Sequence, residues 1–153
     1  MKTVKELKEE LFEALKTSQT LEDFRDVIFS DTDGEIFSWA TNDLDDSEAP
    51  ETTRDALQEK GVAIVICSCD KRKNADSIPN VANREARFPI LVLTNCTTEN
   101  APDPQDTVDF VECAIAEIRR DPLKQAWFLD ESNQYGRDTN NYVVFATHKY
   151  IVG

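Results

Sequence analysis

The sequence has four cysteines and one histidine, the residue types typical of zinc sites and of thiol or imidazole catalysis: Cys67, Cys69, Cys96, Cys113 and His148. A zinc site would need ligands at regular spacing, such as Cys-x-x-Cys, and the sequence contains no such spacing. Because the cysteines lie among apolar residues, we expect reduced thiols that act as small core residues. We expect Cys67 and Cys69 to share one face of a strand. The pattern predicts no metal site.

Carboxylates are abundant and could bind a cation. Asp31 and Asp33 precede Gly34, and this spacing is part of the pattern of a calcium-binding loop. A complete loop needs further carboxylates at fixed offsets and a closing bidentate glutamate. We therefore expect a solvated acidic surface over residues 31–51 rather than a calcium site.

Other catalytic patterns are missing from the sequence. It contains no glycine-rich phosphate loop, no His-Glu-x-x-His and no Gly-x-Ser-x-Gly. No spacing places a nucleophile near His148, so we expect this side chain to be exposed or partly packed rather than a general base. The sequence predicts no catalytic residues and no cofactor, which indicates a protein that is not an enzyme.

The chain of 153 residues has a formal net charge of −13. This charge argues against nucleic-acid binding by phosphate neutralisation, which needs clustered Lys and Arg. The segment 71–85 is an exception, because it carries Lys71, Arg72, Lys73 and Arg84. Three interpretations of it remain open: a mobile loop, an arm that contacts an acidic neighbour, or a nucleic-acid contact, although no aromatic residues accompany the charges.

Two apolar segments define the expected centre of the fold. Residues 62–69 and 88–94 are rich in Val, Ile and Leu, and both faces of each segment are apolar. This composition is typical of central strands that are covered on both sides. The polar connection between them, residues 71–85, is too long for a tight hairpin turn.

The other elements follow from periodicity and turn residues. Leucines at helical spacing predict a first helix at 4–15 that docks on the sheet, with a partner-binding helix as the alternative. We expect further helices at 21–29 (capped by Thr20), at 51–60 (ending at Gly61) and from about 107 to 118, and strands at 35–40, 125–130 and 141–152.

The predicted fold class is α+β, with a mainly antiparallel sheet of about four to five strands flanked by helices. The expected order is helix, helix, strand, helix, strand, strand, helix, strand, strand. We expect one domain over residues 1–153, with a helical, acidic part at 1–60 and a strand–strand–helix–strand–strand core at 61–153.

Neither a membrane segment nor a signal peptide is predicted. No segment approaches the ~20 apolar residues that a membrane helix needs. The N-terminal segment MKTVKELKEE is charged and lacks the apolar centre of a signal peptide. We expect a protein without membrane contact, in the cytoplasm or in a particle assembled there.

The order of elements after Gly61 resembles that of the tail-terminator, or tail-completion, proteins of long-tailed bacteriophages and prophages. Gly61-Val62 opens an apolar strand, and a second strand, FPILVLTNC, leaves through a polar segment that contains Asn95. A helix beginning near Thr107-Val108 and a closing aromatic strand, NYVVFATHKYIV, complete the resemblance. It covers about 90 residues and rests on element order and small motifs.

The resemblance implies a structural protein of the virion, assembled in the host cytoplasm. Such proteins form a ring, usually a hexamer, that caps the tail tube and joins it to the head connector, and DNA passes through without specific binding. Closing a ring requires two different patches on each subunit. Our candidates are a cationic set, Lys71, Arg72, Lys73 and Arg84, and an acidic set, Asp43, Asp45, Asp46 and Glu48.

Two other classes of protein stay open. The first is a small acidic binding module, such as a DNA mimic or an inhibitor that occupies a basic site on a partner. The second is an unrecognised enzyme. A mimic would stay small and bind its basic partner with salt-sensitive affinity, whereas a ring protein associates with copies of itself.

Overall fold

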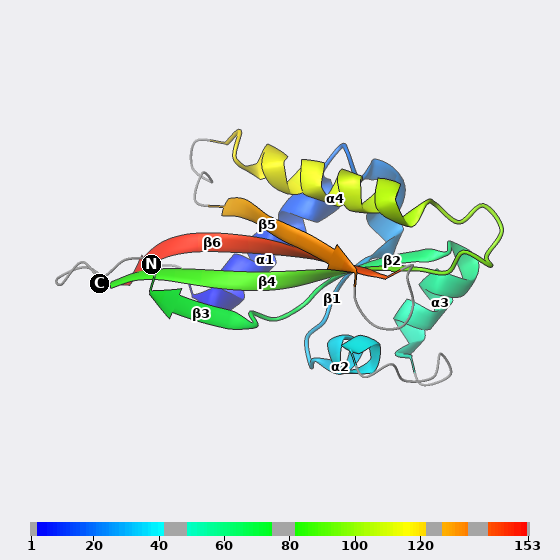
Figure 1. Cartoon of the computed structure of the whole chain (residues 1–153), viewed down its shortest axis with the longest axis horizontal. Coiled ribbons are helices and arrows are strands. Elements are labelled where there is room, and N and C mark those ends of the chain that lie inside the picture. The colour runs from blue at the N-terminus through cyan, green and yellow to red at the C-terminus, as the bar shows by residue number, and fades with distance from the viewer. Residues whose placement is uncertain (1–2, 42–48, 75–81, 122–126, 135–140, 153) are drawn as a thin grey trace.

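The structure, a computed structural model, describes residues 3–41, 49–74, 82–121, 127–134 and 141–152. Its centre is a six-stranded sheet in the order β1-β2-β4-β6-β5, with β3 also paired to β4 (Figure 1). β1 is parallel to β2, and the other pairs are antiparallel. The strands are β1 (Ile28–Ser30), β2 (Val62–Ile66), β3 (Lys71–Asn74), β4 (Ala82–Thr94), β5 (Trp127–Gln134) and β6 (Tyr142–Val152).

Helices cover both faces of this sheet, which confirms the predicted α+β class. α1 and α4 pack on one face, whereas α2 and α3 pack on the other (Figure 1). Their bounds are α1 (Val4–Thr17), the 3₁₀ helix η1 (Glu22–Val27), α2 (Glu35–Thr41), α3 (Glu51–Glu59) and α4 (Pro104–Ile118). None of these described helices is long and apolar enough to cross a membrane.

The two central strands are apolar on both faces, as predicted. Ile64 and Ile66 of β2 join the core cluster under α1 and α4, whereas Ala63 and Val65 join the cluster under α2 and α3. The leucine stripe of α1 is fully buried in the first cluster, so its predicted docking on the sheet is confirmed. The driving force is the removal of apolar surface from water on both sides of one sheet.

β4 is the central strand, and two different strands share one of its edges. β3 pairs with residues 84–87 of β4, and β2 pairs with residues 90–94. Pro89 lies where the partner changes, and its carbonyl accepts a hydrogen bond from the Cys67 N–H at 2.9 Å. In a strand, the N–H and C=O of one residue point to the same edge. The N–H that proline lacks would therefore point to the edge of β4 where pairing changes from β3 to β2. A proline is therefore tolerated inside a central strand.

The segment 35–40, predicted as a strand, is the helix α2. Ile36, Trp39 and Ala40 are buried together, which is the i, i+3, i+4 spacing of a helix face. The buried Asp31 carboxylate accepts backbone N–H bonds from Ile36 at 3.4 Å and Phe37 at 3.0 Å, so it caps the first turn. So short a segment fits both the strand and the helix periodicity, and the cap from Asp31 stabilises the helix.

The segment 21–29 also differs from its prediction. It forms η1 followed by the short strand β1, and no side chain caps η1. Thr20, the expected cap, instead donates its hydroxyl hydrogen to Glu117 of α4 at 2.6 Å. The connection 71–85 is likewise more regular than predicted, because residues 71–74 form β3 and β4 begins at Ala82.

Gly61 ends α3 with φ +76, in the left-handed region expected for a helix C-terminus. A Cβ atom at this position would lie 2.5 Å from the Cβ of Ala101, and the Asn95 N–H donates to the Gly61 carbonyl at 2.8 Å. Gly61 therefore permits both a backbone conformation and a close approach of two segments.

We predict that Gly61→Ala destabilises the protein more than Gly34→Ala does. Gly34 has nearly the same φ, +75, but nothing lies within 4 Å of an added Cβ. Its substitution should cost about 1–2 kcal/mol of backbone strain, and Gly61→Ala should add roughly 1–3 kcal/mol from overpacking. Denaturant unfolding of both variants measures the two losses, and equal losses would contradict the packing argument.

Candidate functional site

The predicted cationic residues lie in one β-ribbon at the end of the sheet (Figure 1). We call residues 70–74, 82–88 and 145–152 the cationic ribbon, which consists of β3, the first half of β4 and the end of β6. It carries six cationic residues (Lys71, Arg72, Lys73, Arg84, Arg87 and Lys149) and two acidic ones (Asp70 and Glu85). The ribbon is thus a positive region within a strongly acidic chain.

The backbone register places the four predicted cationic residues near one another. Lys71, Arg72 and Lys73 are consecutive in β3, and Arg84 of β4 is the register partner of Asn74. The acidic candidates, Asp43, Asp45, Asp46 and Glu48, lie outside the described residues. The pairing of the cationic set with the acidic set therefore stays a prediction.

An ion pair fixes the base of the cationic ribbon. Arg87 donates from Nε to Asp70 Oδ1 at 2.9 Å and from Nη2 to Asp70 Oδ2 at 2.6 Å, which is a bidentate pair. The guanidinium carbon of Arg87 also lies 4.1 Å from the centre of the Phe145 ring. These contacts hold Asp70, the residue before β3, against Arg87 of β4, which in turn packs on Phe145 of β6. Sequence spacing gives no sign of them, because they depend on the strand register.

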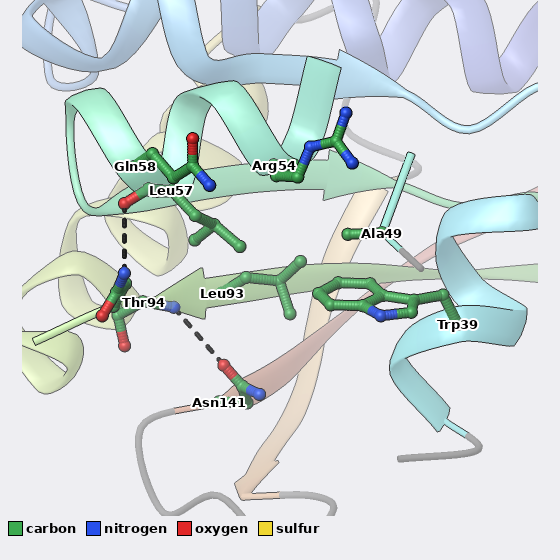
Figure 2. A pocket seen from close by; sticks show the side chains of 9 residues that line it. Trp39, Ala49, Arg54, Leu57, Gln58, Leu93, Thr94 and Asn141 are labelled. Carbon is green, nitrogen blue, oxygen red and sulfur yellow. Dashed lines mark hydrogen bonds between the residues drawn. The ribbon is translucent and has the colours of Figure 1, made fainter. Parts of the chain in front are cut away.

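A second feature is a cleft of about 150 Å³ between α2, α3 and the end of β4 (Figure 2). Its apolar walls come from Trp39, Ala49, Leu57 and Leu93, and its polar groups come from Arg54, Gln58, Thr94, Asn95 and Asn141. The Thr94 N–H donates to Asn141 Oδ1 at 3.4 Å, and Asn95 Nδ2 donates to the Leu57 carbonyl at 3.5 Å. Four segments, around residues 39, 49–58, 93–95 and 141, therefore form one small cleft with polar groups at its edge.

The described lining of this cleft combines apolar walls with amide, hydroxyl and guanidinium groups. Its described lining includes no carboxylate, histidine or cysteine, so it presents no pair of groups for general acid–base or thiol chemistry. A cavity of this size accommodates one ring-sized group. The sequence did not predict the cleft, because its residues follow no local spacing and meet only through the fold.

The sequence prediction for His148 is wrong, because this side chain is buried. Its exposed fraction is 8%, and its ring centre lies 4.7 Å from that of Trp127 in an edge-on arrangement. Trp127 in turn donates its Nε1 hydrogen to Glu10 Oε1 at 3.0 Å. His148 is thus part of the packing between β6, β5 and α1 rather than of a surface site.

The four cysteines form no disulfide, as predicted, but only some are core residues. Cys67 is buried, and burial raises the pKa of its thiol to about 12, with further contributions from Asp31 and Asp70. Cys69 packs against the opposite core cluster, so the predicted shared face is wrong, because β2 ends at Ile66. Cys96 and Cys113 are exposed, which also differs from the prediction.

Asp31, the first carboxylate of the partial calcium pattern, is used as the cap of α2. Within the described part of the chain, no group of three or more His, Cys, Asp or Glu side chains is arranged to hold a metal ion. The local geometry thus gives Asp31 a structural role.

Comparisons with known proteins add no assignment. No protein-family model matches the chain, and a search among curated proteins found no match. The functional argument therefore depends on the residues and their geometry.

We predict that the cysteines differ in how fast iodoacetamide alkylates them in the native protein. Cys96 and Cys113 should react in the folded protein because they are exposed, whereas Cys67 should react only after unfolding. A thiol with a pKa of about 12 stays protonated near neutral pH, so both burial and charge state protect it. Peptide mass spectrometry with and without guanidinium measures the labelling, and fast labelling of Cys67 in native buffer would contradict this picture.

Proposed function

We propose that this protein is a tail terminator of a long-tailed bacteriophage or prophage. In this role it forms a ring, of six copies in the usual arrangement, that caps the tail tube and meets the head connector. Its work is structural, with DNA passing through the ring without specific binding. The protein is then part of the virion neck and is assembled in the host cytoplasm.

The observation that carries this proposal is the cationic ribbon. Although the chain has a net charge of −13, six cationic residues lie in the three paired strand segments, from β3, β4 and β6, at the end of the sheet. Lysines on an edge strand also discourage uncontrolled strand pairing, so this charge has a protective function even without a partner. In the proposed ring, an acidic patch on the neighbouring copy attracts the cationic residues of the ribbon, so that the two surfaces form a specific contact.

The arrangement of elements supports the proposal. β2, β4, α4, β5 and β6 follow one another as strand, strand, helix, strand and strand, which is the order on which the resemblance rests. The structure adds β3 within the connection between the first two of these strands. A ring requires two different patches per subunit, and the cationic ribbon is one of them in this proposal.

The second patch of the proposed contact is acidic. Asp43, Asp45, Asp46 and Glu48 lie close together in sequence, with no Lys or Arg between them. In the assembled ring these residues contact the cationic ribbon of the next copy. The remaining acidic surface repels the phosphates of passing DNA, which keeps the opening from binding it.

We predict that the double variant Lys71→Glu/Arg72→Glu weakens self-association in low salt. The change places negative charge on β3, so the acidic patch of the next copy is repelled rather than attracted. Static light scattering at low and high ionic strength measures the mass of the assembly. The difference from the parent protein should shrink at high salt, because screening weakens exposed charge pairs.

The matched control is Arg119→Glu/Arg120→Glu. These residues are exposed at the end of α4 and lie outside the cationic ribbon, and the control changes the net charge by the same amount. It should assemble like the parent protein. A parent protein that stays a monomer at all concentrations, or a ribbon variant that assembles normally, would overturn the proposal.

A further inference from the structure

A hollow of about 500 Å³ lies beside the first half of α1, on the face of the sheet opposite the cleft of Figure 2. We call it the α1 hollow. Four segments line it: α1, the end of β1 with the turn that follows, the segment between β2 and β3, and β4. The lining residues are Val4, Lys5, Lys8, Glu9, Ser30, Thr32, Ser68, Cys69 and Phe88.

The ammonium group of Lys8 is held in place at this hollow. Its Nζ donates to the backbone carbonyl of Asp31 and to Ser68 Oγ, the latter at 3.3 Å. The side chain is half-buried, and this burial lowers the pKa of Lys8 despite the opposing charge of Asp31. A partly desolvated ammonium interacts more strongly with an incoming anion than a fully solvated one does. Lys8 is therefore positioned to bind a negative group.

Hydroxyl groups surround this cation. Ser30, Thr32 and Ser68 all line the hollow, and each can donate one hydrogen bond to an oxygen of a bound anion. Hydrogen bonds from hydroxyl and ammonium groups to a charged oxygen are stronger than neutral ones. The polar side of the α1 hollow thus has the donors that a carboxylate needs.

The opposite side of the hollow is apolar. The half-buried Val4 and Cys69 provide its accessible apolar surface, whereas Phe88 also lines the hollow but is fully buried. An anion without a hydrocarbon part would leave this surface in contact with water. A ligand that has an alkyl stem gains from covering it, at roughly 25 cal/mol for each Å² removed from water. The mixture of surfaces therefore favours an amphipathic ligand.

The charge of the lining selects the charge of the ligand. Lys5 and Lys8 are cationic, Glu9 is anionic, and the nearby Asp31 carboxylate also acts on Lys8, so the charges around the hollow are balanced. A monocarboxylate adds less negative charge beside Glu9 and Asp31 than a doubly charged phosphate does. This balance favours a carboxylate over a phosphate.

We propose that the α1 hollow is a binding site for a small carboxylate with an apolar stem. The carboxylate accepts hydrogen bonds from the Lys8 ammonium and from the surrounding hydroxyls, and the stem lies against Val4 and Cys69. This proposal does not depend on ring assembly, and its test does not measure assembly.

The test is an NMR titration of the ¹⁵N-labelled full chain with hexanoate. Hexanoate should shift the amide signals of Lys8, Thr32 and Ser68 in a saturable way, with a dissociation constant on the order of 1 mM for so small a ligand. Hexanol has the stem without the charge, and inorganic phosphate has the charge without the stem. Each should bind at least about tenfold more weakly. Equal binding of either probe would overturn the proposal.

Two variants locate the site. Lys8→Met should weaken hexanoate binding at least about tenfold, because it removes the charge and keeps most of the side-chain length. The matched control is Lys16→Met, since Lys16 is also half-buried on α1 and donates to a backbone carbonyl, that of Arg25 at 2.8 Å. The control should bind like the parent protein.

A third variant keeps the test decisive if Lys8→Met does not fold. Lys5 is exposed, so Lys5→Met should leave the fold intact and still weaken hexanoate binding about threefold through its charge. Unchanged binding in both Lys5→Met and a folded Lys8→Met, or the same loss in Lys16→Met, would overturn the assignment of the site.

Discussion

Burial of β4 on both faces is the constraint on which the rest of the structure depends. This strand of 13 residues pairs with β6 along one edge and with β3 and β2 in succession along the other. Its apolar residues enter both core clusters, so α1 and α4 on one side and α2 and α3 on the other all pack against the same central element. Pro89 permits the change of partner without an unpaired donor at the break. The cationic ribbon follows from this arrangement, because it contains the end of β4 that extends past β2.

Much of the fold was predictable because it depends on strong periodic signals. The leucine stripe of the first helix has helical spacing, and the β-branched composition of the two doubly apolar strands and of the closing strand 141–152 favours extended structure. The segment 35–40 was mistaken because six residues satisfy two periodicities, and the deciding contact comes from Asp31, outside the segment. His148 and Cys69 were misplaced for a related reason, since burial depends on where a strand ends and on what packs above it.

The candidate sites were only partly predictable. Consecutive cations in the sequence indicated a cationic segment at 71–85, because charge clustering is a local property, but they did not indicate that part of it is a strand. The bidentate contact between Arg87 and Asp70, the cleft beside Trp39 and the position of Lys8 depend on register and on packing between distant segments. No local pattern contains that information. The α1 hollow also borders the segment that leads into β3.

The pairing of β4 with β6 also has a mechanical consequence. Eleven consecutive register pairs join these strands, from Ala82 with Val152 to Val92 with Tyr142, and they run without interruption from the cationic ribbon into the core. A pull along β4 against β6 would load the hydrogen bonds between them in shear, so many of them would have to break together rather than one at a time. The same two paired strands form the ribbon and part of the core, so a force at the end of the ribbon reaches the core without passing through a loop.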